Sequence, residues 1–468
     1  MKTPIRVPLA GPRPSRSGNT RSSRQPAVAP ARRLAYRLLL QIAASGAHSD
    51  DLLHSPEVDA LSVPDRALTT TLVLGSLRWQ LALDFRIRPL LARPQATLSP
   101  EAAIALRMGA YQLLHLDRVP AHAVLHDAVE LVKATPQRGA AGMVNAVLRK
   151  IQQSAAGARP SHEPRLAHPS WMVERWVRRY GIEAAEAICR WDQEPSALAL
   201  RAGAGTELAG IETEPGYFLS RARRVLRGDL SAALRDGRVR IQDEASQLVA
   251  ELLSAACQDA APGEPKPRVL DLCAAPGGKT AILAERLPRA EITAVDVSGK
   301  RVDRMRETMP RPLLDRMRFE VADAAKTELR PDWDLILVDV PCCGTGTLAR
   351  NPEIRLRLHE PDLARQHERQ VAILRAALRG LRPGGRLVYS TCSIEPEENE
   401  QVVAKVLETA EGFALLPVDS ILDRLAQSGA VTPQGRERLR TAIVGNFLRT
   451  LPGVHPCDGF FAAVVERR

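Results

Sequence analysis

Two cysteines that lie 50 positions apart have the residue type and the placement that thiol chemistry needs. Cys342 ends the run from Val338, and Cys392 lies in the run from Tyr389 to Ser393; both runs predict short apolar strands. A glycine-rich turn, Asp271 to Thr280, lies upstream, where a nucleotide-type cofactor would bind. A thiolate can form a covalent intermediate with its substrate, so the three segments together predict covalent chemistry on a base.

The glycine turn Ala275-Pro276-Gly277-Gly278-Lys279-Thr280 predicts a tight connection from a strand to a helix. Glycines let backbone amides approach a ligand closely, and a helix N-terminus favours a carboxylate or a phosphate. The turn is neither a complete GxGxxG fingerprint nor a P-loop, because the first glycine of a P-loop would fall on Cys273. We therefore expect a small anionic group of a cofactor here, and ATP hydrolysis is disfavoured.

Aspartates follow the next predicted strands in order. Asp296 ends the second strand, where an acid can accept the hydroxyls of a ribose, and Asp323 follows the third, where an acid can meet an adenine amino group. A single aspartate at a strand end is more often a helix cap or a loop residue. The glycine turn, Asp296, Asp323 and Asp339 in succession resemble the S-adenosylmethionine-dependent methyltransferases, whose open sheet binds its ligand at the carboxyl edge. The resemblance implies S-adenosylmethionine as the cofactor.

In the usual methyltransferase sheet the fourth and fifth strands are neighbours, about 5 Å apart, so Cys342 and Cys392 would both face the donor methyl group. The C5 of cytosine is weakly nucleophilic, but a thiolate that adds at C6 makes an enamine whose C5 can take a methyl group. A second thiol can help remove the C5 proton, and Asp339 can hold the N3 and amino edge of the base. Either cysteine alone would more often be a small buried hydrophobe. For Cys343 a packing role is favoured over a vicinal disulfide or a metal site.

The elements that must position these residues alternate between apolar strands and helices from residue 241 onward. This alternation predicts a parallel sheet with helices on both faces, that is, a Rossmann-like α/β domain over 241–468. An apolar segment at 459–466 suits a last antiparallel strand. The predicted parallel strands are 268–272, 291–297, 318–322, 334–340 and 386–390.

The preceding part of the chain predicts a multidomain protein. Apolar residues recur at helical spacing over 31–153 and predict an all-α bundle, in which Asp65 begins one helix and Ser99 stands before another. Residues 152–164 have the composition of a linker, and 161–240 are expected to form connector helices and a small α+β module for RNA recognition. The tryptophans of that module could stack on bases, although aromatic residues at helical spacing are more often part of a core.

The distribution of charge and the number of cysteines bear on the N-terminal segment, on metal binding and on the location of the protein. The first 33 residues carry eight Lys or Arg and no acid, which leaves +3 of the net +11 for the rest of the 468 residues. Residues 1–30 are therefore predicted to be a disordered basic tail, which either adds affinity for phosphates or has no function; its prolines disfavour a transit peptide. Seven cysteines without a CxxC pair disfavour zinc or another metal. With no apolar run long enough for a membrane span, we expect a cytoplasmic protein.

Several motifs, in order, resemble the Sun/Fmu type of RNA cytosine-5 methyltransferase within the NOL1/NOP2/Sun family, over 31–468. They are Gln242 to Gln247, Asp271 to Lys279, Pro341-Cys342, Arg350 to Arg355, Thr391-Cys392-Ser393 and Glu397 to Glu400. The resemblance implies that Cys392 is the nucleophile and that Cys342 assists product release, with Asp339 positioning the base and Lys279 in the catalytic set. It places the following around the cofactor: Cys273, Ala274, Ala275, Pro276, Gly277, Gly278, Lys279, Asp296, Asp323 and Asp339. One departure is Val340, where the family more often has alanine.

The helical unit resembles the NusB RNA-binding fold, most clearly in Gly109 to Pro120 and Arg138 to Arg149. Together the resemblances imply methylation of C5 of a cytosine in 16S small-subunit rRNA, as free or early-assembly RNA, with no obligate protein partner and no membrane. Two alternatives remain: an RNA-binding assembly or antitermination factor whose methyltransferase unit only binds, and a tRNA cytosine-5 methyltransferase.

Overall fold

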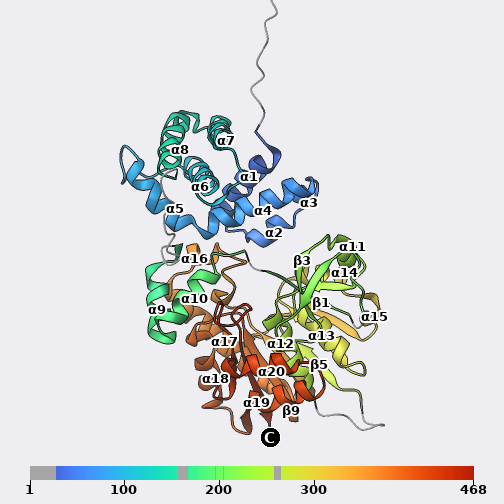
Figure 1. Cartoon of the computed structure of the whole chain (residues 1–468). Coiled ribbons are helices and arrows are strands. Elements are labelled where there is room, and N and C mark those ends of the chain that lie inside the picture. Colours follow the sequence, from blue (N-terminus) through green and yellow to red (C-terminus); the bar gives the residue numbers. More distant parts are fainter. Residues whose placement is uncertain (1–27, 156–166, 196, 204, 258–264) are drawn as a thin grey trace, which may run out of the picture.

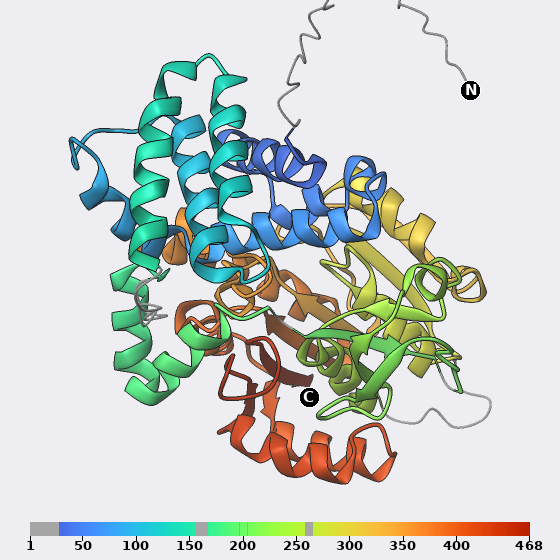
Figure 2. The ribbon, with the colours of Figure 1, turned by 45° about the horizontal axis from the view of Figure 1, so that its top comes forward.

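The computed structural model describes residues 28–155, 167–195, 197–203, 205–257 and 265–468. The predicted basic tail falls outside this description up to residue 27, and so does most of the predicted linker. Figure 1 shows a helical unit at one end of the molecule, connector helices α9 and α10 below it, and a large sheet with its covering helices at the other end. Figure 2 shows the helical unit from a second direction, packed across the remainder of the chain.

The helical unit confirms the predicted bundle. Its helices are α1 (Pro30–Ser45), α2 (Ser49–Leu53), α3 (Pro56–Asp59), α4 (Val63–Arg78), α5 (Gln80–Ile87), α6 (Pro100–His115), α7 (Ala121–Lys133) and α8 (Ala141–Ala155). Ser99 caps α6 as expected, because its hydroxyl accepts the backbone N–H of Ala102. The helix α4 begins at Val63 rather than at Asp65, because the Ser62 hydroxyl accepts the N–H of Asp65 and makes Ser62 the N-cap.

The connector helices α9 (Ser170–Tyr180) and α10 (Ile182–Trp191) pack on the large domain. Trp176 is 1% exposed and shares an apolar cluster with Leu348 and Ile394, so this tryptophan is part of a core and not a stacking platform. A separate antiparallel sheet follows, in the order β2-β3-β1-β4. Its strands are β1 (Leu198–Ala202), β2 (Glu212–Pro215), β3 (Ala222–Arg227) and β4 (Val239–Ile241), with α11 (Ser231–Arg235) before the last.

The large sheet has nine strands in the order β11-β12-β13-β9-β8-β5-β6-β7, with β10 beside β13. Its parallel strands are β5 (Arg268–Asp271), β6 (Glu291–Asp296), β7 (Met317–Val321), β8 (Trp333–Asp339) and β9 (Leu381–Thr391). The others are β10 (Phe413–Leu416), β11 (Ile443–Val444), β12 (Phe447–Arg449) and β13 (Phe461–Arg467), and β13 pairs antiparallel with β9 as predicted for the C-terminal segment.

The central parallel strands are apolar on both faces, because helices cover both sides of the sheet, whereas the edge strand β7 carries the exposed Arg318 and Glu320. Leu335 and Leu337 pack in one core cluster, and Ile336 and Val338 pack in the other. The covering helices include α12 (Glu244–Ala256), α13 (Gly278–Arg286), α14 (Gly299–Thr308), α17 (Glu360–Gly380), α18 (Glu400–Leu407) and α19 (Val418–Gln427). No helix among the described residues is long and apolar enough to cross a membrane.

The strand order creates the place for a site. The chain runs outward from β5 through β6 to β7 and then returns to the other side of β5 with β8. Open α/β sheets bind ligands outside the carboxyl ends of the strands where the order reverses in this way. The glycine turn follows β5 and Asp339 ends β8, so both lie at this reversal point.

Candidate active site

The structure brings the two predicted thiols together. Strands β8 and β9 are parallel neighbours, with Asp339 opposite Ser390, and the segments that follow them carry Cys342 and Cys392. The two Sγ atoms are 3.2 Å apart. Hydrogen bonding with Cys392, burial and nearby negative charge raise the pKa of the Cys342 thiol well above its usual value. The pair can therefore share one proton between two sulfurs.

A close backbone contact fixes the loop of Cys392. The N–H of Gly346 donates to the Cys392 carbonyl at 2.9 Å, and the N–H of Gly459 donates to the Gly346 carbonyl at 2.8 Å. A Cβ at position 346 would lie 2.1 Å from the Gly459 oxygen and 2.8 Å from the Cys392 oxygen, so only glycine allows the three segments to meet.

A lysine–aspartate pair lies beside the thiols. The Nζ of Lys279 donates to Asp339 Oδ2 at 2.7 Å and to the hydroxyl of Ser246 at 2.8 Å. The other oxygen of Asp339 accepts the Ser390 hydroxyl at 2.6 Å. Asp339 is thus fixed at both oxygens while its side chain keeps 26% exposure, which leaves part of the carboxylate open to a ligand. Motif reading singled out neither Ser246 nor Ser390, although both lie in segments named above.

The glycine turn forms a cradle before α13. Gly277 has φ +100°, and a Cβ there would lie 2.6 Å from the side chain of Met305. The helix α13 begins at Gly278 without a side-chain cap, so its first backbone N–H groups are available to an anionic group. The carboxylate of Asp296, 4% exposed, accepts the N–H of Ala275 at 3.3 Å and of Ser298 at 3.0 Å. This donor and acceptor set fits the carboxylate and the ribose of S-adenosylmethionine.

The residues under and beside the cradle differ in exposure. Burial raises the pKa of Asp271 to about 7, although the Thr280 hydroxyl donates to it at 2.7 Å. Burial, followed by the negative charge of Asp271, also raises the pKa of Cys273, so this thiol stays neutral. Asp323 lies after β7, and its side chain is 40% exposed, 3.4 Å from Lys326 Nζ. Asp323 thus has the most exposed side chain of the three aspartates at the strand ends, Asp296, Asp323 and Asp339.

Comparison with known proteins agrees with this architecture. Residues 260–466 match the family model described as 16S rRNA methyltransferase RsmB/F, and residues 29–153 match the NusB family. The probable ribosomal RNA small subunit methyltransferase B of Bacillus subtilis (strain 168) is 34% identical over 93% of this chain and 98% of its own length. The chain belongs to the RsmB/F family of methyltransferases. A second relative, ribosomal RNA small subunit methyltransferase B of Xanthomonas campestris pv. campestris, is 34% identical over 86% of this chain and 89% of its own.

Solved structures support the same fold. The crystal structure of PH0851 superposes with a TM-score of 0.74 at 23% identity and covers 94% of this chain and 100% of its own. A methyltransferase homolog protein from Pyrococcus horikoshii reaches a TM-score of 0.50 at 24% identity over 66% of this chain and 99% of its own. The predicted fold class, a NusB-like helical bundle joined to an α/β methyltransferase domain, is therefore confirmed. S-adenosylmethionine-dependent methylation follows from membership of the family.

The Arg350 to Arg355 motif of this family member joins the domains. Glu353 is 1% exposed and accepts the N–H of Ser49 at 3.0 Å and its hydroxyl at 2.8 Å, at the start of α2. The guanidinium of Arg355 is buried and donates to the carbonyls of Arg78, Ala167, Asp192 and Leu348. Motif reading gave this segment no structural role, because its partners lie in distant parts of the chain.

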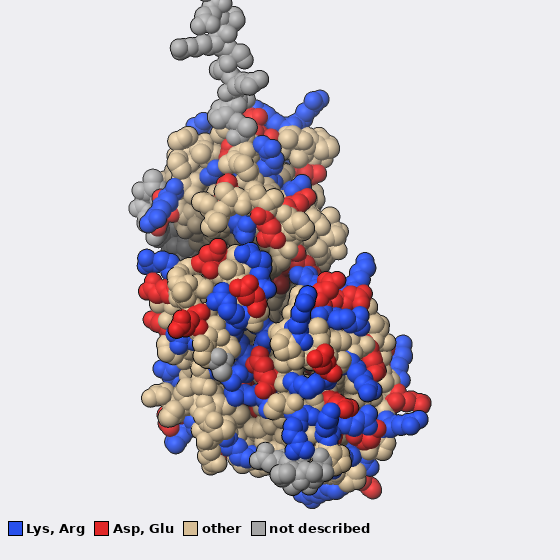
Figure 3. Space-filling model, turned by 90° about the vertical axis from the view of Figure 1, so that its right-hand side faces the viewer, with Lys and Arg blue, Asp and Glu red and all other residues tan. Residues whose placement is uncertain are grey.

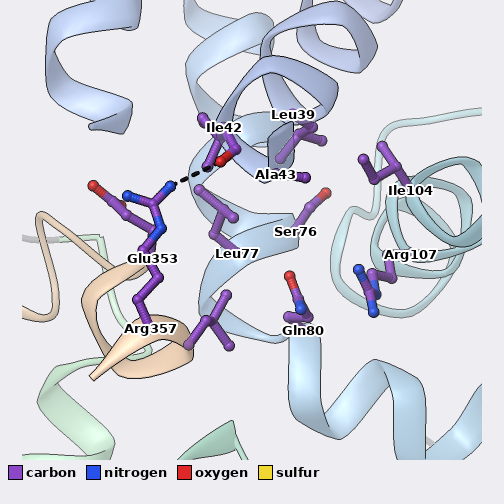
Figure 4. Close-up of a pocket in the computed structure, with 11 residues that line it drawn as sticks. Leu39, Ile42, Ala43, Ser76, Leu77, Gln80, Ile104, Arg107, Glu353 and Arg357 are labelled. Carbon is purple, nitrogen blue, oxygen red and sulfur yellow. Dashed lines mark hydrogen bonds between the residues drawn. The ribbon is translucent and has the colours of Figure 1, made fainter. Parts of the chain in front are cut away.

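Arginines complete the junction from both sides. Arg78, at the end of α4, donates to the Ala349 carbonyl at 2.6 and 3.0 Å. Arg357, in α16 (Ile354–Arg357), donates to the carbonyls of Ile42, Gly46 and Ala47 around the end of α1. Figure 4 shows the Arg357 guanidinium directed at Ile42, beside a cavity of about 200 Å³ whose walls come from α1, α4, α5, α6 and α16.

A groove of about 470 Å³ leads from this junction to Cys342. Its walls include His48 of the helical unit and Cys342 and Cys343 of the methyltransferase domain. Arg357, Arg365 and Arg369 give the groove positive charge, and among the described residues the partly exposed Asp362 is the one acid on its walls. Figure 3 shows one face of the molecule, hollowed between the helical unit and the remainder, with Lys and Arg side chains on both sides of the hollow.

Proposed function

We propose that this protein transfers a methyl group from S-adenosylmethionine to C5 of a cytosine in 16S small-subunit rRNA, through a covalent bond between Cys392 and C6 of the base. The product is 5-methylcytidine. The observation that carries the proposal is the 3.2 Å approach of the Cys342 and Cys392 sulfurs beside the Lys279–Asp339 pair. A binding factor would have no need of two thiols at this distance.

Each residue of the site has a defined part in this reaction. The Cys392 thiolate adds at C6, and the ring electrons move to C5, which takes the methyl group that the bound cofactor supplies. Asp339 accepts a hydrogen bond from the amino group of the base, beside N3, and Lys279 keeps Asp339 in place. Cys342 then takes the C5 proton; the C5–C6 double bond reforms, and the electron pair of the C6–S bond returns to Cys392.

The cofactor would lie in the cradle after β5. The backbone of Cys273 to Lys279 and the N-terminus of α13 would hold its anionic end, Asp296 its ribose and Asp323 its adenine. NSun6 from Pyrococcus horikoshii superposes on this chain with a TM-score of 0.50. Its crystal structure was solved with SFG, an analogue of S-adenosylmethionine.

The substrate assignment rests on the relatives and on the groove. The two relatives described above are named for small-subunit ribosomal RNA, and the NusB family match covers 29–153. Arginines along an open groove suit the phosphates of a single strand, and an unpaired cytosine could reach Cys392 only if it leaves its stack. Free or early-assembly RNA therefore suits this site better than a finished subunit, and a cytoplasmic setting would keep the thiols reduced.

The test is transfer of labelled methyl groups to naked 16S rRNA and to tRNA, with each reaction also run on a denaturing gel. We expect Cys392→Ala to abolish transfer and Cys342→Ala to accumulate a protein–RNA adduct. Cys257→Ala, a thiol change at the end of α12 and outside the site, is the control and should behave as the native protein. Full activity of Cys392→Ala would remove the proposed nucleophile. Transfer to tRNA alone would change the substrate, and no transfer to either RNA would favour the binding factor.

A further inference from the structure

Glu398 is a buried carboxylate that the proposed chemistry does not use. It lies at the end of the short 3-10 helix Pro396–Glu398 and is 0% exposed. Its Oε1 accepts the N–H of Cys343 at 2.8 Å and the side-chain amide of Gln370 at 3.0 Å, and its Oε2 accepts the Cys343 thiol at 2.6 Å. All three partners are neutral donors.

In the part of the chain that the structure describes, Glu398 has no cationic partner, unlike two other buried glutamates of this domain, Glu251 and Glu395. Among the described residues, no Lys, Arg or His side chain pairs with Glu398, whereas Glu251 pairs with Arg201 and Arg286. Glu395, three residues earlier, pairs with Arg175. A buried charge without a counter-ion exerts a stronger field on its neighbours than a paired one.

The contacts of Glu398 fix the turn that carries Cys342. Gln370 donates to the Pro341 carbonyl at 3.0 Å as well as to Glu398, so one amide ties both sides of Cys342. The Tyr389 hydroxyl donates to the Glu398 carbonyl at 2.6 Å and joins the turn to β9. The negative charge of Glu398 contributes to the raised pKa of Cys342, after the hydrogen bond with Cys392, burial and the charge of Cys392.

Several other titratable or charged groups face Cys342. Cys392 lies across the pair and Cys343 follows in the chain, and the buried Tyr389 of β9 and the Lys279–Asp339 pair at the end of β8 lie nearby. The groove beside it contributes His48 from the helical unit, Arg357 from α16, and Asp362, Arg365 and Arg369 from α17. The arginines oppose the effect of Glu398, but they lie on an open groove, where solvent weakens their field.

We propose that Glu398 is a positioning residue for product release: it orients Cys342 toward Cys392, and its charge keeps the proton of the thiol pair on Cys342. This inference rests on the proposed function. The free enzyme then holds Cys342 as the thiol that donates to a Cys392 thiolate. Once Cys392 is bonded to C6, Cys342 loses its proton to water, and the resulting thiolate takes the C5 proton. The cycle ends with one proton released and the Cys392 thiolate restored.

The test is the pH dependence of adduct breakdown in a single turnover, followed by quenching into a denaturing gel. In Glu398→Gln, removal of the charge lowers the pKa of Cys342, so the midpoint should move to lower pH by about one unit. The rate at high pH should fall several-fold, because the thiolate is then a weaker base. Glu397→Gln is the matched control: its carboxylate pairs with Arg175 at 2.7 and 2.8 Å, and the midpoint should stay unchanged.

A second pair of variants covers the case in which Glu398→Gln does not fold. Cys343→Ala removes one donor from Glu398 and leaves its charge less neutralised, so the midpoint should move to higher pH. Cys343→Ser keeps a donor and should stay near the native midpoint. Identical midpoints within each pair would overturn the role of Glu398 while the methyl transfer itself stands. If the native protein and Cys342→Ala form no adduct at all, the proposed function fails, and this inference fails with it.

Discussion

The edge of the sheet that carries the thiols places its functional groups on neighbouring strand ends, whereas the junction with the helical unit depends on arginines that reach backbone carbonyls. At the edge, Asp339 and Ser390 are opposite each other in adjacent strands, so sheet pairing alone brings Cys342 and Cys392 near. At the junction, Arg78 and Ala349 are 271 positions apart and meet through a hydrogen bond. The edge can therefore be inferred from motifs, while the junction depends on how two folded units dock.

The largest expected effect lies at the edge. Asp339→Asn should lower methyl transfer by about 100- to 1,000-fold, because the side chain loses the ion pair with Lys279 and the negative charge that binds the amino group of the base. The free energy of unfolding should change far less, since the Asp339 side chain is 26% exposed. Single-turnover transfer and thermal unfolding measure the two. An equal loss of activity in Asp334→Asn, whose carboxylate lies at the opposite end of β8, would show that the effect is not specific to the edge.

The junction should respond in stability instead. Arg355→Met should lower the free energy of unfolding by about 2–3 kcal/mol, because the carbonyls that the buried guanidinium serves lose their donor. Denaturant unfolding measures the change, and binding of S-adenosylmethionine should persist in the folded fraction. The exposed Arg375→Met, on α17, is the control. If Arg355→Met lowered the affinity for S-adenosylmethionine as much as it lowers stability, the junction and the thiol edge would not be functionally distinct.

Asp271, at the end of β5 on the same edge of the sheet, should make the free energy of unfolding depend on pH. Its folded pKa of about 7 lies above the value of an unfolded aspartate, so the folded state holds the proton more tightly. Stability from this group is therefore present at low pH and is lost as the pH rises from about 4 to about 7. Asp271→Asn should remove this slope, which amounts to about 4 kcal/mol between those limits. Unfolding at a series of pH values measures it; parallel curves for the two proteins would contradict the assignment.

The smallest expected effect concerns His48 at the junction. Its pKa is raised, first by the hydrogen bond with Glu353, so the pair stabilises the fold below the unfolded pKa of histidine and loses this contribution as the pH rises through the folded value. His48 is 63% exposed, and His48→Gln should cost no more than about 0.2–1 kcal/mol at pH 6. The difference from the native protein should vanish near pH 8. A cost that persists there would indicate a role in packing.

Much of the methyltransferase domain follows from local patterns. Short apolar runs alternate with helical ones, and each predicted parallel strand is present within a residue or two, apart from β9, which starts earlier. Asp296 and Asp339 end strands because a parallel sheet collects its carboxyl ends at one edge. The start of a helix is less well determined by sequence. Before α4, both Ser62 and Asp65 are suitable N-caps, and the structure selects Ser62 because its hydroxyl reaches the N–H of Asp65.

Other residues could not be assigned from sequence, although they lie in quoted motifs. Ser246 and Glu398 have no distinctive spacing of their own, and their partners, Lys279 and Cys343, come from separate elements. The reason is physical: a buried hydrogen bond depends on distance and direction in space, and neither is encoded by position in a short run.

The sequence by itself determined the strand and helix order, the glycine turn and the presence of two thiols at strand ends, because these depend on periodicity and on the backbone freedom of glycine. The tertiary structure alone decided that the sulfurs lie 3.2 Å apart, that Glu398 lies behind Cys342, and that Arg350 to Arg355 hold the helical unit. These features depend on contacts between segments far apart in the chain, which exist only after the domains have packed.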